Sequence, residues 1–141
     1  MANVIYNSYK KTLLDKTIDH ANDTLKVALC TASYTPDADN HDFFNDVTNE
    51  VSSSGYTAGG ATLANKSTAQ DNTDNEGVFD SDDPSWTGVT FTARWAILYQ
   101  STGNAATSRL ICAFDLGGDV SVVGGTLTLT VPAEGWLNTT S

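Results

Sequence analysis

The sequence is poor in basic side chains. It has 7 lysine and arginine residues against 17 aspartate and glutamate residues, which gives a formal net charge of −10. Nucleic-acid backbones attract positive protein surface, and so do anionic membranes. Three bases lie close together, at Lys10, Lys11 and Lys16, and we interpret them as the solvent face of a short helix. The composition therefore argues against nucleic acid and membrane surfaces as partners.

Cysteine is scarce as well. Cys30 and Cys112 lie within the apolar stretches VALCT and LICAF, which we predict to be strands. A thiol in such a strand usually behaves as a small buried side chain, and burial favours its neutral, unreactive form. We expect two core thiols; the alternative is a disulfide, which would need the two strands to be neighbours with matching Cβ geometry.

Long hydrophobic runs are absent. No stretch approaches the roughly 18 consecutive apolar residues that indicate a membrane-spanning helix. The first residues, MANVIYNSYKKTLL, lack the charged start and the long apolar run of a signal peptide. We therefore expect a chain that is made in the cytoplasm and stays soluble, unless it leaves the cell as part of an assembly.

Catalytic motifs are missing too. There is no Gly-x-Ser-x-Gly elbow, no phosphate-binding loop, and His20 and His41 do not have the spacing of zinc ligands. His41-Asp42 could orient a general base, but no nucleophile accompanies it. We therefore predict a protein that is not an enzyme.

Acidic residues are plentiful between residues 71 and 83, but they do not follow a known metal-binding pattern. Calcium prefers several oxygen ligands on one loop, and the spacing of an EF-hand loop is not found here. We predict solvated turns and no metal or other cofactor. The two groups of acids are Asp71, Asp74 and Glu76, and then Asp80, Asp82 and Asp83.

The remaining composition is typical of a globular β-rich chain. A length of 141 residues fits one domain, and we predict a single domain over residues 1–141 in which residues 1–7 form a possible extended N-terminal arm. Only 17% of the residues are charged. The surface must therefore be built largely from Thr, Ser, Asn and Gly, as in proteins with many strands and turns.

Hydrophobic alternation predicts the strands. In 24–33, Leu25, Val27 and Leu29 share one face, and 91–100 alternates in the same way. In the segment 8–17, Tyr9, Leu13 and Leu14 have helical spacing and are predicted to face the core. We predict a mainly β fold, a β-sandwich or small barrel of about six or seven strands, with a short N-terminal helix and one further short helix. The other predicted strands are 61–70, 78–83, 109–116 and 126–131, the second helix is at 41–47, and 117–125 is predicted to be a turn.

Exposed aromatic and apolar residues are the candidates for partner contacts. We predict that one of two adjacent phenylalanines fills the core and that the other is either core or an interface anchor. The Ser/Gly-rich loop 52–60 is interpreted as an adaptable surface. Trp86, which follows Pro84, is predicted to be exposed. The candidate interface residues are Val4, Ile5, Tyr6, Phe43, Phe44 and Tyr56.

Five segments, taken in order, resemble a family of small structural proteins of tailed-bacteriophage virions. The resemblance covers about residues 3–115 and weakens towards the C-terminus. It implies membership in a virion and brings no catalytic residues. The segments are VIYNSYKKTLL, DTLKVALCTASYTPDADNHDFFNDVTNEV, GYTAGGATLANK, FDSDDPSW and FTARWAILY.

Small acidic β-rich virion proteins are often capsid decoration (cement) proteins. From this size, composition and acidic charge we expect a location on the capsid exterior with the major capsid protein as partner, and symmetric sites on a shell would favour a dimer or trimer. A tail tube, tail-terminator or connector protein is one alternative. A carbohydrate-binding or host-binding fibre module is another.

Overall fold

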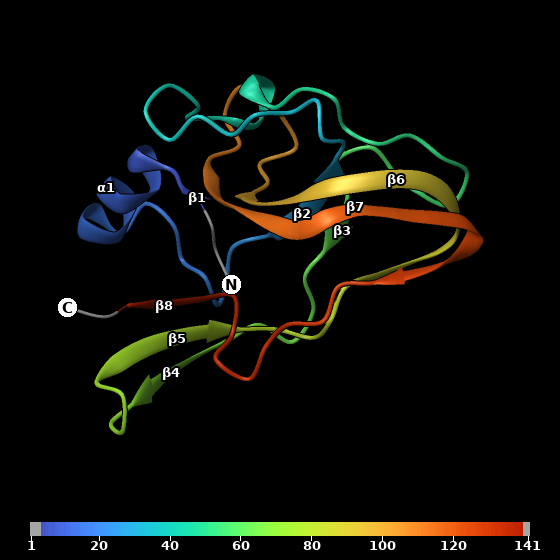
Figure 1. The fold of residues 1–141 in the computed structure, drawn as a ribbon. Helices are drawn as coiled ribbons and strands as arrows, with labels where there is room; N and C mark the ends of the chain where they lie inside the picture. The colour runs from blue at the N-terminus through green and yellow to red at the C-terminus, as the bar shows by residue number, and fades with distance from the viewer. Residues whose placement is uncertain (1–3, 140–141) are drawn as a thin grey trace.

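The protein is mainly β in a computed structural model, which describes residues 4–139 (Figure 1). One helix and a single 3-10 turn, η1, accompany the strands over this range. The elements are β1 (Val4–Ile5), α1 (Asn7–Asp15), β2 (Leu25–Cys30), η1 (Phe44–Asp46), β3 (Ala61–Thr62), β4 (Ser67–Asp71), β5 (Glu76–Asp80), β6 (Ser85–Gln100), β7 (Leu110–Thr128) and β8 (Leu137–Thr139).

The strands form two antiparallel sheets. The large sheet has the order β1-β7-β6-β2-β3, and the small sheet has the order β4-β5-β8. Neither sheet closes on itself, so of the two predicted architectures the layered one is correct and the barrel is not. In the part of the chain that the structure describes, no helix has the length and apolar character needed to cross a membrane.

The β6–β7 pair is the longest feature of the fold. It runs from Ser85↔Thr128 to Tyr99↔Leu110 with several shifts of register, and it bends at the end furthest from α1, so that its ends enter the layer of the small sheet (Figure 1). The prediction of a turn at 117–125 and a separate strand after it was wrong. The glycines of this segment lie within a bulged strand, where Gly117 and Gly124 take positive φ angles.

The main core lies between the two layers. Residues of the large sheet meet Phe79 and Leu137 of the small sheet, and Trp136 is fully buried beside Phe114. The alternation of β2 is confirmed, because its odd-numbered residues Leu25, Val27 and Leu29 all join this core.

A second core covers the other face of β2. Ala28 and Cys30 pack there with Ile97 and Tyr99 of the neighbouring strand β6. The irregular segment 31–50 lies over this face, and Tyr34 from it is buried in the same cluster. Since both faces of β2 are covered, the strand is almost entirely buried.

Helix α1 packs against the sheet through a narrow face. Tyr9 and Thr12 are buried, and the helix ends at Lys16 in the left-handed conformation. The predicted orientation of its leucines was wrong: Leu13 is 45% exposed and Leu14 is 89% exposed. A nine-residue helix at the margin of a sheet has only one side covered, so Leu14 faces away from it.

Candidate protein interface

Two of the candidate interface residues are buried inside the monomer. Tyr6 is completely inaccessible, and its hydroxyl lies 2.8 Å from that of Tyr34. The Tyr56 hydroxyl accepts the Leu29 N–H at 3.0 Å and donates to the Glu50 carboxylate at 2.7 Å. Both tyrosines therefore have internal partners, which corrects their prediction as partner contacts.

The N-terminal candidates belong to the sheet. Val4 pairs with Ala113 and Ile5 pairs with Cys112, both antiparallel. Each side chain is half-buried. Of the predicted arm 1–7, residues 4–5 are the edge strand β1, while Tyr6 precedes α1 and Asn7 begins it; residues 1–3 lie outside the described residues.

The two adjacent phenylalanines have different surroundings. The ring of Phe44 stacks on Tyr99, with centroids 4.1 Å apart, and packs against the second core. Phe43 lies under the guanidinium of Arg109, which is 5.4 Å from the ring centroid. Both rings are half-buried, so Phe43 retains some surface for a partner while Phe44 mainly fixes segment 31–50.

The histidines and the cysteines have separate surroundings. His20 Nε2 lies 2.8 Å from the Tyr9 hydroxyl, and burial lowers the pKa of His20. His41 Nδ1 accepts the Asp37 N–H at 3.2 Å. Burial raises the pKa of Cys30 to about 12 and raises that of Cys112 as well, so burial favours the neutral form of both thiols.

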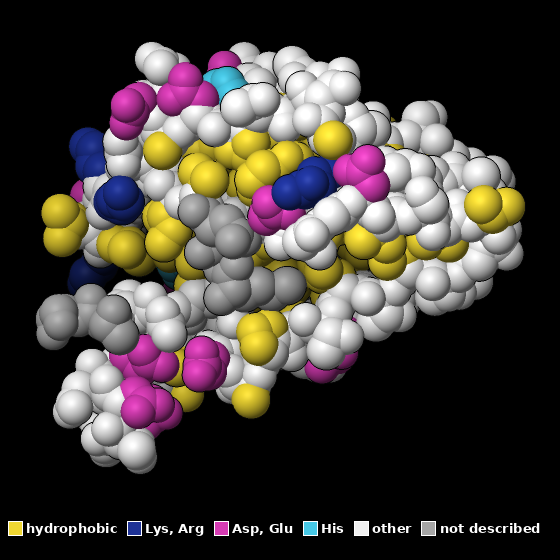
Figure 2. Space-filling model, in the orientation of Figure 1, with side chains coloured by type: hydrophobic (Ala, Val, Ile, Leu, Met, Phe, Trp, Pro, Cys, Tyr) yellow, Lys and Arg dark blue, Asp and Glu magenta, His cyan; other side chains and the backbone are white. Residues whose placement is uncertain are grey.

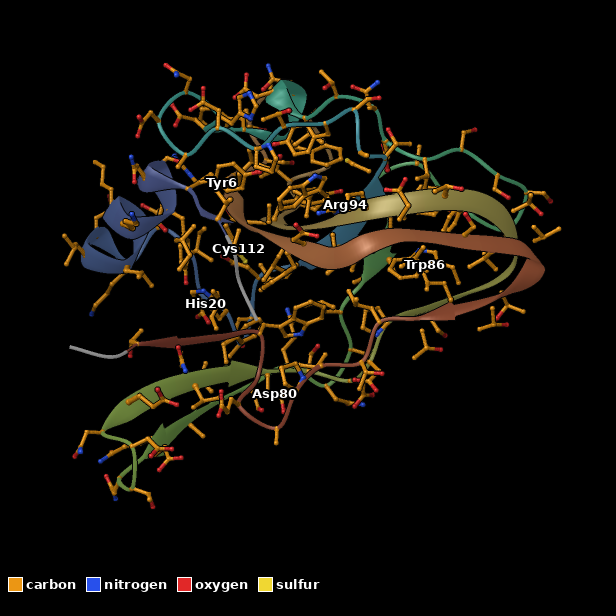
Figure 3. The ribbon with its side chains drawn as sticks, viewed as in Figure 1. Tyr6, His20, Asp80, Trp86, Arg94 and Cys112 are labelled. Carbon is orange, nitrogen blue, oxygen red and sulfur yellow. The ribbon has the colours of Figure 1, made fainter. Side chains whose placement is uncertain are left out.

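The expected free thiols are confirmed. Cys30 and Cys112 are both free and buried, and they belong to the separate cores on the two sides of the large sheet. The alternative, a disulfide, is not formed. Figure 3 shows Cys112 beside the N-terminal segment, near Tyr6.

The acidic cluster at the β4–β5 turn has a structural explanation. Carboxylate oxygens of Asp71, Asp74 and Glu76 lie within 4.8 Å of one another. Asp71 Oδ1 accepts the N–H groups of Thr73 and Asp74, at 2.7 and 3.2 Å. These bonds close the turn, as an aspartate at its first position commonly does.

The prediction that Trp86 is exposed was wrong. Its side chain is 4% exposed and points between the layers (Figure 3). Trp136 is fully buried, and Trp95 is half-buried against the second core. The flat aromatic surface on which a sugar could stack is therefore not provided by Trp86.

A cavity of about 280 Å³ lies beside the second core, with Lys26, Glu50 and Tyr99 in its wall. Glu50 Oε1 accepts the Gly59 N–H at 2.6 Å as well as the Tyr56 hydroxyl. The Tyr99 hydroxyl donates to the Gly59 carbonyl at 2.6 Å. These hydrogen bonds hold the loop 56–60 in place.

The most exposed apolar side chains near a cavity are on α1. Leu13 and Leu14 are accompanied by three of the seven bases of the chain, Lys10, Lys11 and Lys16. We call these five residues the α1 surface. Hydrophobic and basic side chains gather on this side of the molecule (Figure 2).

An apolar cleft of about 180 Å³ adjoins the α1 surface, between the helix and the small sheet. Leu13 forms part of its wall, so the cleft meets the α1 surface at this residue. The other lining residues include Tyr9, His20, Val78, Phe79 and Leu137.

The α1 surface was not predicted from the sequence, although a signal was present. Successive residues of a helix are about 100° apart. Leu14 is five residues from the buried Tyr9 and is therefore about 140° round the helix from it. The two side chains could not both have faced one core.

Comparisons with known protein families, with curated proteins and with solved structures found no match to this chain.

Proposed function

We propose that this protein is a non-enzymatic structural component of a tailed-phage virion, a capsid decoration protein that binds the major capsid protein on the outer shell. The resemblance of its ordered segments to virion proteins suggests the particle. The α1 surface is the observation that supports docking onto another protein. On the described residues, the clusters of titratable groups have structural partners, which leaves binding as the better-supported activity.

The chemistry of the α1 surface indicates the kind of partner. Burying an exposed leucine contributes about 1.5–3 kcal/mol, so a partner with an apolar recess gains from Leu14, which is 89% exposed. The flanking lysines favour a recess with an acidic rim. Lys11 is already paired with Asp15 at 2.7 Å. Lys10 donates to the neutral amide of Asn7, so its charge, like that of Lys16, can still be matched by the rim.

The net charge favours the outside of the shell. DNA would repel a chain of charge −10, so the inner wall of the capsid is a poor location. A protein that binds only the closed shell stabilises it by linkage. The proposed role is therefore mechanical: several copies hold neighbouring capsid subunits together against the pressure of the packaged genome.

The first experiment is a reconstruction of the native particle by electron cryo-microscopy. Density in hundreds of copies over the junctions of the major capsid protein would support the proposal. Density confined to the tail or neck would overturn it in favour of a tail or connector protein. Particles with and without the protein would also be heated, and equal rupture temperatures would contradict the stabilising role.

A matched pair of variants tests the proposed surface. Leu14→Asp should weaken binding to shells lacking the protein by at least about tenfold, which corresponds to 1.4 kcal/mol. Val123→Asp is the control, because Val123 is a similarly exposed apolar residue (84%) on β7, away from α1. Equal loss of binding in both variants, or in neither, would argue against the α1 surface as the docking site.

A further inference from the structure

We propose that the cavity beside the second core binds a free α-amino acid with an apolar side chain, whose carboxylate meets Lys26 and whose ammonium meets Glu50. The inference does not rest on the virion role. The cavity has a volume of about 280 Å³, close to the lower end of the range of roughly 300–1,000 Å³ for ligand pockets. Its ligand must therefore be small.

Lys26 supplies a positive charge that has no partner. It belongs to β2, where every other residue is buried, and Ala28 and Cys30 on the same face of the strand lie in the second core. Lysine is rarely placed in such surroundings unless it is paired. Within residues 4–139, however, its ammonium makes no hydrogen bond or ion pair. The charge is thus available to an anionic group in the cavity.

Glu50 supplies the opposite charge. Its carboxylate accepts two hydrogen bonds, from the Gly59 N–H at 2.6 Å and from the Tyr56 hydroxyl at 2.7 Å, and both go to Oε1. No group in the described range 4–139 donates to Oε2. Because a carboxylate oxygen can accept further hydrogen bonds, Oε2 remains able to bind the ammonium of a ligand.

Gly59 leaves space open near both charges. A Cβ at this residue would lie 4.0 Å from Lys26 Nζ and 3.1 Å from the Tyr99 hydroxyl oxygen, while the Gly59 N–H is bound to Glu50. Lys26 and Glu50 are therefore both close to Gly59, yet in the described part of the chain they form no ion pair with each other. The two charged groups of an α-amino acid are separated by a single carbon, so one molecule is short enough to bridge them.

The wall also offers an apolar surface for the side chain of the ligand. The ring of Phe44 stacks on Tyr99 with centroids 4.1 Å apart, and Ala58 and Ala105 lie in the same wall. Contact with these groups removes apolar surface of the ligand from water. A ligand that carried only a negative charge would be repelled by a chain of charge −10, whereas a zwitterion has no net charge.

The wall of the cavity is held in place by hydrogen bonds. The Phe44 N–H donates to the Ser108 carbonyl at 2.8 Å, and the Asn45 N–H donates to the Ala105 carbonyl at 3.2 Å. The Tyr99 hydroxyl donates to the Gly59 carbonyl at 2.6 Å. Since these bonds already fix the loops around the cavity, little of the protein has to be ordered when a ligand binds, which lowers the cost of binding.

The first test is a titration of isotope-labelled protein with L-leucine, followed by the chemical shifts of the backbone amides. We expect saturable shifts at Gly59, Asn104 and Ala105, with a Kd of about 1 mM or tighter for a ligand of this size. The absence of saturable shifts up to about 10 mM leucine would overturn the proposal, and so would shifts confined to the cleft beside α1.

Two analogues of leucine test the role of its charges. 3-Methylbutylamine lacks the carboxylate, and 4-methylpentanoic acid lacks the ammonium. Each should bind at least about tenfold more weakly than leucine, because each loses one charge-assisted hydrogen bond. Binding of either analogue as tight as that of leucine would contradict the proposed recognition of a zwitterion.

Matched variants locate the two charges. Lys26→Met removes the ammonium, and Glu50→Gln removes the negative charge but keeps an Oε1 that can still accept the two hydrogen bonds of the loop. Both should weaken leucine binding by about tenfold or more. The controls are Lys66→Met and Glu134→Gln, which remove the same charges from residues outside the cavity and should leave binding unchanged.

Leucine binding that is unaffected in both cavity variants, or reduced equally in the cavity and control variants, would count against the site. The amide spectrum of each variant shows whether its fold is retained, and Lys26→Met alone decides if Glu50→Gln does not fold. Because purified protein is used, failure here leaves the virion role unaffected, and failure of shell binding leaves the amino-acid site unaffected.

Discussion

At the scale of single residues, the polar groups of this protein are used mainly to fix irregular segments. Glu50 holds the loop 56–60 through two hydrogen bonds, and Asp71 closes the β4–β5 turn. Buried polar atoms need such partners, because an unsatisfied one costs free energy. The carboxylates of Glu50 and Asp71 therefore each stabilise an irregular segment of the fold.

His20 predicts a pH dependence of stability. Its ring lies between Tyr9 and Phe79, at centroid distances of 5.7 and 5.2 Å, and burial lowers its pKa from 6.5. The unfolded chain therefore binds the proton more readily than the folded chain. The contribution of His20 to the free energy of unfolding should be complete above about pH 6.5. The free energy of unfolding should then fall as the pH drops below this value.

The size of this effect is limited by the surroundings of His20. Asp19 and Asp23 favour the charged ring and Lys66 opposes it. Because the site is partly open to solvent, we expect a fraction of the roughly 1.4 kcal/mol per pH unit of a full shift. Urea titrations between pH 7.5 and pH 5 would show the slope. His20→Gln should reduce it, and an unchanged slope in that variant would contradict the assignment.

At the scale of secondary-structure elements, close packing of backbone next to β3 makes one glycine essential. Gly60 has φ +82°, and a Cβ there would lie 1.9 Å from the Val27 carbonyl oxygen. Gly103 has a similar φ of +84°, but no atom lies within 4 Å of its Cβ position. The two positions share their backbone strain and differ only in available space.

Replacing these glycines by alanine should separate strain from collision. Gly103→Ala should cost about 1 kcal/mol, the penalty of the left-handed conformation. Gly60→Ala should cost several times that, roughly 3 kcal/mol or more, because the Val27–Ala61 pairing must also move. Chemical denaturation measures both. Similar losses in the two variants would show that the contact with Val27 is relieved cheaply.

Some secondary-structure elements could be predicted from the sequence and others could not. The alternation of β2 and the start of α1 were predictable, because apolar spacing determines which face is buried. The glycines of 117–125 were interpreted as a turn, although β6 supplies a partner strand along which they form bulges. The packing of segment 31–50 over β2 was not predictable either, since the hydrophobic residues of this segment have no regular spacing.

Of the candidate interface residues, Tyr6 and Tyr56 are buried inside the monomer. They were misplaced because the apolar character of a residue alone does not distinguish a core from a contact surface.

At the scale of the whole molecule, the fold must open before a reagent in solution can reach either cysteine. Cys30 and Cys112 are fully buried in the two separate cores, and burial raises the pKa of each thiol. The native protein should therefore react negligibly with a water-soluble disulfide reagent at pH 8. In guanidinium chloride both thiols should react at once.

The rate of labelling without denaturant then measures how often the fold opens. Rapid modification of one thiol in native conditions would show that one core opens independently of the other. Equal, slow rates for Cys30 and Cys112 would indicate that the two cores unfold together.

The buried thiols have a practical consequence for chemical modification. A cysteine introduced on the surface would be the one readily accessible thiol among the cysteines of the chain. Val123 is a suitable position, since it is 84% exposed and lies far along β7 from Ala113, the residue that pairs with Val4 just before α1. A fluorophore, affinity tag or antigen attached there would be carried on the side remote from the proposed docking surface, so the protein could serve as a carrier for molecular display without redesign of its fold.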